Sequence, residues 1–317
     1  MNKIISMIQE TLISNNIDYK SIEYLAGDAS NRKYFKILQK KVSNILMYDD
    51  LKEKSIENFI LKTKQFNRLG IKVPKIFFSF SKQGILILEN LGNLKYNNIL
   101  THENEKRLYK IAIDSLAHLH KTKIKINFKI YSKHLFFEES KLFFDWYLKF
   151  KEKEFTSKQF KEFKDLLYEA LDIPLSLPKV YIHRDFHVDN LFFLPSNKGI
   201  QKCGWIDYQD ALFGPLVYDV VSILDDARRV IGRELKEELL NYYLDRVEFE
   251  DKNLFKLAFS IIAVQRHLKV LGIFARLHIR DDKSEYLEHI PNIISMLKTN
   301  LEVKSLKGMK DLISNFL

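Results

Sequence analysis

Residues 179–207, KVYIHRDFHVDNLFFLPSNKGIQKCGWID, decide the fold of this chain. Within them, the apolar runs LFFL and CGWI flank the turn PSNKG and predict a β-hairpin. Antiparallel pairing places Asn190, at the start of one strand, beside Asp207, at the end of its partner. Asp185 lies five residues before Asn190, on the loop that enters the hairpin. The pattern therefore predicts two carboxylates and a carboxamide at one end of a small β unit.

These residue types suit phosphoryl transfer from a magnesium–nucleotide complex. Mg²⁺ prefers oxygen ligands and usually takes one or two carboxylates, so Asn190 and Asp207 are the candidate metal ligands. Asp185, left off the metal, is the candidate catalytic base for an attacking hydroxyl. The spacing from His183-Arg184-Asp185 to Asn190 matches the H-R-D-x-x-x-x-N signature of kinase catalytic loops. The alternative is that these Asp and Asn residues occur here only because they favour loops. It explains each residue singly but not the order of strands and acidic residues.

The composition is that of a globular protein. The chain has 317 residues, of which 46% are hydrophobic and 29% charged, and its length suits two lobes. A single cysteine, Cys203, excludes a disulfide framework and any multi-cysteine metal site. The apolar N-terminal run is too short for a secretory signal, and the longest apolar stretch, 257–264, is about half a membrane span. We therefore expect a soluble, cytoplasmic protein with no membrane partner.

The net charge of +10 raises the question of a polyanionic partner. The lysines are scattered singly among opposite charges, as in KEKEFTSKQFKEFK, and form no block of five or six. A bias towards Lys, Asn and Ile along the whole chain explains the charge better than a basic patch does. We expect no nucleic-acid partner.

Hydrophobic periodicity divides the chain into a β-rich and a helical part. A polar, Gly-containing break at 89–93 follows a buried strand and marks the boundary, which gives an N-lobe at 1–92 and a C-lobe at 93–317. The expected strands of the first part cover 17–25, 32–38, 42–47, 76–80 and 84–88, and the expected helices cover 3–15, 55–69, 104–120, 135–151, 157–171, 217–230, 233–246, 252–277 and 284–300.

Several motifs together resemble the aminoglycoside phosphotransferase-like kinases. Within that family the chain is most similar to the anomeric kinases that phosphorylate N-acetylmuramate and N-acetylglucosamine in cell-wall recycling. The catalytic loop is common to the whole superfamily, whereas the last two motifs are more specific to the sugar-kinase group. The motifs are GDASNRKYF (27–35), VPKI (73–76), LENLG (88–92), LAHLH (116–120), HRDFHVDNL (183–191), IDYQDALFGPLVYDVVSILDDAR (206–228) and QRHLKVLGIFARL (265–277).

The resemblance implies an α+β, protein-kinase-like bilobal fold. A small β-rich N-lobe with one packed helix would bind the nucleotide, and a larger, mainly helical C-lobe would carry the catalytic hairpin, the metal site and the acceptor site. It further implies ATP and Mg²⁺ as cofactors and an amino-sugar hydroxyl as acceptor, at C1 of N-acetylmuramate or N-acetylglucosamine, in peptidoglycan recycling. We expect a monomer whose partner is a small-molecule sugar.

The nucleotide site is expected in the first lobe. The turn 27–30 lies between two strands, so its amides and the Ser30 hydroxyl could approach phosphates. The resemblance places an adenine-binding hinge at 89–91. The third strand ends in Met47 where protein kinases have a phosphate-binding lysine. The resemblance implies that the sugar-kinase group tolerates Met there. Arg32 and Lys33 on the neighbouring strand are the candidate replacements, and Arg32 is the one that we predict to contact the phosphates. The predicted nucleotide-binding residues are Gly27, Asp28, Ala29, Ser30, Arg32, Glu89 and Leu91.

The acceptor site is expected after Asp207. Carboxylates suit sugar hydroxyls, and a guanidinium suits an amide carbonyl or a lactyl carboxylate. Asp225 and Arg228 are three residues apart in an expected helix and would share one face, although a local ion pair between them explains the spacing as well. Asp219 is expected to brace the catalytic loop. The predicted acceptor residues are Gln209, Asp210, Asp225 and Arg228.

A second pattern leaves its role open. Gln265, Lys269, Gly272 and Arg276 form one helical stripe that either contacts substrate or faces solvent.

Two other functions are compatible with the sequence. The acceptor could be an aminoglycoside or another amino alcohol, although such cations need acidic clusters and the chain is basic. The missing lysine also suggests a nucleotide-binding pseudokinase or interaction protein. The presence of Asp185, Asn190 and Asp207 together disfavours that alternative.

Overall fold

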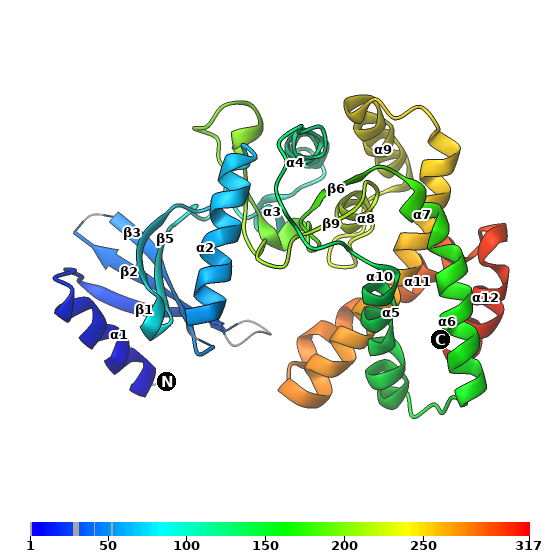
Figure 1. The fold of residues 1–317 in the computed structure, drawn as a ribbon, viewed down its shortest axis with the longest axis horizontal. Helices are drawn as coiled ribbons and strands as arrows, with labels where there is room; N and C mark the ends of the chain where they lie inside the picture. The colour runs from blue at the N-terminus through cyan, green and yellow to red at the C-terminus, as the bar shows by residue number, and fades with distance from the viewer. Residues whose placement is uncertain (1, 28–31, 41, 52) are drawn as a thin grey trace. The chain divides into compact units, whose positions relative to one another are not determined.

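The structure is a computed structural model that describes residues 2–27, 32–40, 42–51 and 53–317. Contacts divide the chain into two units (Figure 1), one made of 1–94 with 192–209 and the other of 95–191 with 210–317. The first break falls close to the boundary expected after residue 92, but the hairpin groups with the first unit instead of the second. The reason is its packing on α2 (Glu53–Arg68), where Phe66 lies 6.0 Å from the Trp205 ring and 5.3 Å from the Tyr208 ring.

The first unit is built on an antiparallel five-stranded sheet. The strand order is β1-β2-β3-β5-β4, and every pair is antiparallel. In this register Arg32 at the start of β2 lies opposite Asp49 at the end of β3. The strands are β1 (Ser21–Gly27), β2 (Arg32–Gln39), β3 (Val42–Asp49), β4 (Ile76–Phe80) and β5 (Ile85–Glu89), close to the expected ranges.

The two faces of this sheet differ in chemistry. Helix α1 (Asn2–Ser14) packs Ile8 and Leu12 onto the apolar face, among strand residues such as Phe35 and Leu46. The opposite face carries the polar pair of Arg32 and Asp49. Because side chains alternate along a strand, one face supplies a core and the other is left for polar contacts.

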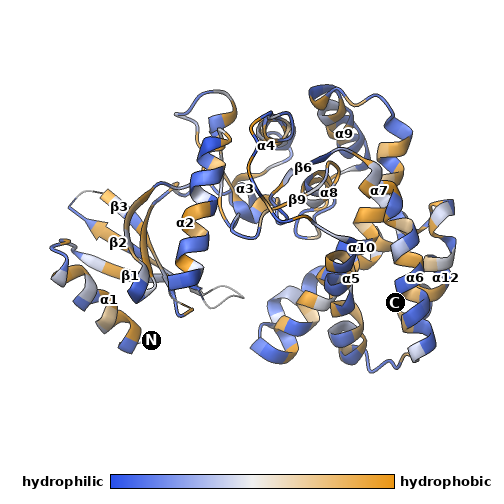
Figure 2. Cartoon of the chain, viewed as in Figure 1, coloured by the Kyte–Doolittle hydropathy of each residue, from blue (hydrophilic) through white to orange (hydrophobic). Residues whose placement is uncertain are grey.

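The second unit is mainly helical around one short β ladder. β6 (Lys179–Ile182) pairs antiparallel with β9 (Leu212–Pro215), a strand that the sequence pattern did not predict. Figure 2 shows hydrophilic and hydrophobic patches alternating around these helices, as expected for helices that pack by one face. Its helices are α3 (Tyr96–Ile99), α4 (Glu105–His120), α5 (Lys133–Leu142), α6 (Ser157–Ala170), α7 (Asp172–Ser176), α8 (Tyr218–Leu224), α9 (Arg233–Val247), α10 (Lys252–Asp281), α11 (Ile290–Leu301) and α12 (Lys307–Ile313).

Helix α10 is the core helix of this unit. It is 30 residues long and apolar enough to cross a membrane by length and composition, but 78% of its most apolar window is buried inside the structure. It packs against α5, α8 and α11. Its apolar surface is therefore used in the core.

Three expected helices differ from the prediction in part of their length. The helix expected over 135–151 is α5 followed by a π-helical turn, Phe143–Leu148, and the one expected over 284–300 begins with a 3₁₀ turn before α11. The helix expected over 217–230 is wrong beyond Leu224, where α8 ends. Asp226 accepts the Arg228 backbone N–H at 3.2 Å, a local bond that competes with helix continuation. The α+β architecture itself is confirmed.

Candidate active site

The loop that follows β6 carries the predicted catalytic residues. It is closed by its own hydrogen bonds: the Asn190 side-chain amide donates to the Asp185 carbonyl oxygen at 2.9 Å. The Asn190 backbone N–H donates to the carbonyl oxygen of His187 at 2.8 Å, and the His187 N–H donates to that of Asp185 at 3.1 Å. These bonds restrain the loop backbone at Asp185 and therefore the position from which its side chain extends.

Asp219, near the start of α8, holds the first part of this loop. Its two carboxylate oxygens accept the backbone N–H groups of His183 at 2.6 Å and Arg184 at 3.0 Å. The side chain is completely buried. Burial raises the pKa of Asp219 to about 7, while the two N–H donors act in the opposite direction. The expectation that Asp219 braces the loop is confirmed.

Asp185 is partly buried and lies among cations. Burial alone raises the pKa of a carboxyl group, but Lys269 and Arg266 of α10 outweigh it, together with His187 and Arg184 of the loop. They hold the pKa of Asp185 well below its usual range. The carboxylate therefore stays ionised at physiological pH, which is the form that can accept a hydrogen bond from a hydroxyl.

The predicted hairpin is present in the first unit. β7 (Leu191–Phe193) pairs with β8 (Cys203–Trp205) in a two-stranded sheet. Asn190 directly precedes β7, and Asp207 follows β8 by two residues. The strand pairing is confirmed, whereas the proximity of the Asn190 and Asp207 side chains stays a prediction.

Asp207 combines a strained backbone with a side-chain partner. Its φ of +62° lies in the left-handed region, where a residue other than glycine is strained and often functional. The Gln209 side-chain amide donates to Asp207 Oδ1 at 2.7 Å, and the Gln209 carbonyl accepts from Asn58 of α2 at 3.4 Å. Gln209, predicted as an acceptor residue, is therefore tied to the predicted metal ligand.

The donor atoms fit a hard divalent cation. Asp207 supplies a carboxylate, and Asn190, whose amide nitrogen is held by the loop, can offer its Oδ1 atom. Gln209 Oε1 is a buried oxygen with no hydrogen-bond partner. In the described part of the chain, no three His, Cys, Asp or Glu side chains gather as a closed transition-metal site requires. Each of these oxygen atoms, Asp207 and Gln209 in the first unit and Asn190 in the second, is of the kind that Mg²⁺ prefers, and Mg²⁺ keeps phosphate and water oxygens among its ligands.

Arg32, the proposed replacement for the missing lysine, lies on the polar face of the sheet. Its Nε atom is 3.1 Å from Asp49 Oδ2, and its Nη2 atom donates to Ser55 of α2 at 3.3 Å. The guanidinium lies over the Phe59 ring, 5.8 Å from its centre. The residue is only 9% exposed, so this is a fixed cation held between β2, β3 and α2.

The remaining nucleotide-binding predictions lie at the edges of the first unit. Glu89, at the end of β5, pairs with Lys72 at 2.6 Å and accepts the Lys75 backbone N–H at 3.0 Å. Leu91 is 9% exposed and packs close to Gly204 of the hairpin. Gly27 ends β1, whereas Asp28, Ala29 and Ser30 lie outside the described residues.

The structure places two predicted acceptor residues in different surroundings. Asp210 is exposed, and its carbonyl oxygen accepts from the Arg184 side chain at 3.1 Å. Asp225 is 8% exposed, pairs with Lys236 and accepts from Asn300 at 2.9 Å. Its carboxylate is occupied within the core of the second unit.

Arg228 is held by two carboxylates. Its Nε atom lies 3.1 Å from Asp189 of the catalytic loop, and its Nη1 atom lies 3.1 Å from Asp226. The expectation that Asp225 and Arg228 share a helical face is wrong, because α8 ends before both. Arg228 nevertheless contacts the catalytic loop directly.

The stripe on α10 faces α5. Gln265 donates to backbone and side-chain oxygens of α5 at 3.1 and 3.3 Å, and Lys269 Nζ lies 3.1 Å from Glu139 Oε2. A Cβ atom at Gly272 would lie 2.2 Å from the carbonyl of Leu142, so the helices touch there. Gln265 and Lys269 are buried, so a solvated face is excluded for them.

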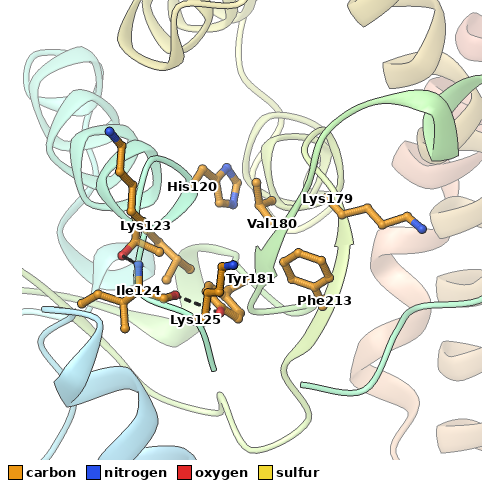
Figure 3. Close-up of a pocket in the computed structure, with 10 residues that line it drawn as sticks. His120, Lys123, Ile124, Lys125, Lys179, Val180, Tyr181 and Phe213 are labelled. Carbon is orange, nitrogen blue, oxygen red and sulfur yellow. Dashed lines mark hydrogen bonds between the residues drawn. The ribbon is translucent and has the colours of Figure 1, made fainter. Parts of the chain in front are cut away.

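A cavity of about 330 Å³ lies in the second unit (Figure 3). It is formed by the end of α4, the following segment and the β6–β9 ladder, and its lysines are exposed at the rim. It contains no predicted site residue. The lining residues are Leu119, His120, Thr122, Lys123, Ile124, Lys125, Lys179, Val180, Tyr181 and Phe213.

Sequence reasoning did not find two residues that contact the loop. Glu139 of α5 pairs with the Arg184 side chain, and Arg266 of α10 donates to the Arg184 carbonyl oxygen at 2.7 Å. For Arg266 the sequence did contain a signal, because it is a charged residue inside an otherwise apolar helix. A buried Arg is rarely tolerated without a partner, so a partner could have been expected. Glu139 had no such signal.

Comparisons with known proteins agree on one family. A sequence model described as "Phosphotransferase enzyme family" matches residues 21–253. The chain is 31% identical to an N-acetylmuramate/N-acetylglucosamine kinase of Neisseria meningitidis serogroup B, over 87% of this chain and 84% of the relative. It is also 31% identical to the protein of the same name from Pseudomonas aeruginosa, over 86% of this chain and 82% of the relative.

Solved structures share the fold at low sequence identity. A choline/ethanolamine kinase family protein from Mesorhizobium loti superposes with a TM-score of 0.67 at 12% identity, covering 99% of both chains. An ADP-bound aminoglycoside phosphotransferase gives a TM-score of 0.62 at 14% identity, covering 92% of this chain and 97% of that one. These likenesses show the protein-kinase-like fold.

Proposed function

Because the chain belongs to the phosphotransferase enzyme family, we propose that it transfers the γ-phosphoryl group of ATP to a hydroxyl of an amino sugar. The names of the relatives support N-acetylmuramate and N-acetylglucosamine as the acceptors. Transfer to C1 is part of the proposal and follows from the resemblance of the sequence motifs to the anomeric sugar kinases. The observation that carries the proposal is the catalytic loop. Asp219 holds the backbone of the two residues before Asp185, and Asn190 binds the Asp185 carbonyl oxygen.

Asp185 accepts the proton of the attacking hydroxyl. A carboxylate with a lowered pKa is a weak base, which suits a loose phosphoryl-transfer transition state. In such a reaction the acceptor hydroxyl keeps most of its proton until after the transition state. Catalysis therefore comes mainly from positioning and charge stabilisation. The rigid loop supplies the positioning.

The first unit supplies the nucleotide side of the reaction. Asp207 of this unit, together with Asn190 of the second, would hold Mg²⁺, which when bound would neutralise charge on the phosphate oxygens. Arg32 contacts the phosphates as a fixed cation, helped by the backbone of Gly27, Asp28, Ala29 and Ser30. The backbone of the segment from Glu89 to Leu91 binds the adenine.

The charges around Asp185 favour a neutral or anionic acceptor. Lys269, Arg266 and Arg184 all lower its pKa by their positive charge, and the single carboxylate of Glu139, which pairs with Lys269 and Arg184, balances only part of that charge. A polycationic aminoglycoside would be repelled there. N-acetylglucosamine is neutral and N-acetylmuramate carries a carboxylate, and a cytoplasmic monomeric kinase of peptidoglycan recycling would meet both.

ADP release measured over a panel of acceptors tests the proposal. With ATP and Mg²⁺, we expect turnover with N-acetylmuramate and N-acetylglucosamine and none with an aminoglycoside or choline. Asp185→Asn should lower turnover by at least about 10²-fold, the usual contribution of a general base, and leave ATP binding unchanged. Turnover only with the aminoglycoside or choline, or near wild-type turnover by Asp185→Asn, would contradict it.

A further inference from the structure

Arg266 of α10 contacts the residue that precedes the proposed base. Its Nη1 atom donates to the Arg184 carbonyl oxygen at 2.7 Å, and its Nη2 atom donates to Ser222 of α8 at 2.6 Å. The guanidinium lies over the Tyr218 ring, 4.7 Å from its centre. Only 8% of the residue is exposed, so the donor is held in one place.

The backbone at Arg184 is strained. Its φ is +80°, a conformation that a residue with a side chain rarely adopts unless its surroundings impose it. Asp219 accepts the Arg184 N–H and the preceding His183 N–H. Arg266 binds the carbonyl at the other end of the same residue, so both of its peptide groups are held by buried charged side chains.

The side chain of Arg184 is held independently of its backbone. Glu139 of α5 pairs with the Arg184 guanidinium, and Lys269 of α10 lies 3.1 Å from the other oxygen of the same carboxylate. This separates two functions: Glu139 binds the side chain, while Asp219 and Arg266 bind the backbone that leads directly into Asp185.

We propose that Arg266 is a positioning residue that holds the strained Arg184 peptide and thereby directs the Asp185 carboxylate towards the acceptor hydroxyl. The inference rests on the proposed function in taking Asp185 as the base. Without the Arg266 bond, the peptide between Arg184 and Asp185 can rotate out of the left-handed conformation. A displacement of the base of about 1 Å is sufficient to cost about 10²-fold in rate.

Two variants separate positioning from general packing. Arg266→Met keeps much of the side-chain volume and loses both donors, whereas Ser222→Ala removes only the Nη2 partner and leaves the bond to Arg184. We expect Arg266→Met to lower kcat about 10²-fold, with the KM values of ATP and sugar within about threefold of wild type. Ser222→Ala should keep kcat within about threefold of wild type.

Arg266→Lys covers the case in which Arg266→Met does not fold. An ammonium group at that position can still donate to the Arg184 carbonyl, so kcat of Arg266→Lys should be at least about tenfold higher than that of Arg266→Met. If the Met variant is unfolded, kcat of the Lys variant should fall between about 10% and 50% of wild type with unchanged KM values. Wild-type kcat in folded Arg266→Met, an equal loss in Ser222→Ala, or a loss confined to KM would overturn the proposal.

Hydrogen exchange gives a readout that needs no substrate. The His183 and Arg184 amides are bonded to Asp219 and should be protected in the wild type and in Ser222→Ala, and should exchange faster in an Arg266 variant that keeps its fold. If the Arg266 variants exchange faster and the wild-type protein phosphorylates no sugar, the positioning role of Arg266 stands and the proposed function is refuted. Unchanged exchange in the Arg266 variants would refute the positioning.

Discussion

Replacing Gly272 of α10 by alanine is expected to destabilise the second unit, because the added methyl group overlaps the backbone of α5. A Cβ atom there would lie 2.2 Å from both the carbonyl carbon and the carbonyl oxygen of Leu142 and 2.6 Å from its Cβ. The contacted atoms are main-chain atoms at the end of α5, where the chain enters a π-helical turn. No rotamer change relieves the overlap, so the two helices must separate.

The size of the effect follows from two opposing contributions. Alanine is favoured over glycine in a helix interior by about 1 kcal/mol. Overpacking a core costs about 1–3 kcal/mol, and the upper end applies here because backbone has to move. The net loss is about 2 kcal/mol, which lowers the melting temperature of the second unit by about 4–8 °C, because that unit has roughly 200 residues. Differential scanning fluorimetry measures it directly.

Gly308 in α12 offers a matched control. A Cβ atom at Gly308 would lie 3.0 Å from Leu166 Cδ2, the movable end of a side chain. Gly308→Ala should therefore leave the melting temperature unchanged or raise it. A melting temperature for Gly272→Ala at or above that of the wild type would refute the close α5–α10 contact. The same helices carry Glu139 and Arg266, so turnover of Gly272→Ala should also fall.

Four further changes test separate parts of the account. Arg32→Ala should raise the KM of ATP severalfold while Lys33→Ala, on the same strand, should not; equal KM values in both would remove Arg32 from the phosphate site. Asp207→Ala should abolish the Mg²⁺-dependent part of nucleotide protection in a thermal-shift assay, and full protection would contradict its metal role. Burial lowers the pKa of His120 from 6.5 to about 3, so its neutral form stabilises the fold above pH 6.5 and that contribution is lost as pH falls towards 3. Between pH 7 and 5 the wild type should lose about 2 kcal/mol more than His120→Gln in urea unfolding, and parallel pH curves would exclude this group. Arg228→Ala should weaken N-acetylmuramate more than N-acetylglucosamine in steady-state kinetics, whereas equal losses would leave Arg228 as a support for Asp189 alone.

The parts of the site that could be predicted from sequence are local. The order of Asp185, Asn190 and Asp207 along one strand–loop–hairpin segment predicts the loop and the β7–β8 pairing, because both form between neighbours in the chain. Asp219 was also identifiable as an acceptor of backbone N–H groups, because acidic residues near helix starts commonly accept them. The groups that it binds belong to the catalytic loop and not to its own helix.

The features that the sequence did not predict depend on contacts between segments that are distant in the chain. Arg266 follows Arg184 by 82 residues, and neither its hydrogen bond nor the strained φ of Arg184 leaves a periodic signal. α8 ends before Asp225, and just beyond it the Asp226 side chain accepts the Arg228 backbone N–H, a bond that competes with helix continuation. The hydrophobic pattern alone is typical of a helix that continues. β9 is four residues long and is recognised only by its partner β6.

The grouping of the hairpin with the first unit has the same origin. The local pattern places the hairpin between expected helices of the C-lobe. Its rings Trp205 and Tyr208 pack instead on Phe66, which lies well over a hundred residues earlier. Packing between such distant residues is decided by the folded structure and not by local propensity.

Phosphorus NMR of the reaction product tests the central claim most directly. With ATP, Mg²⁺ and N-acetylglucosamine or N-acetylmuramate, the account predicts ADP together with a new phosphomonoester signal coupled to the anomeric proton, as a sugar 1-phosphate gives. Asp185→Asn should produce that signal at least about 10²-fold more slowly. A phosphate on any other hydroxyl would contradict transfer to C1, and release of inorganic phosphate without a sugar ester would contradict the kinase itself.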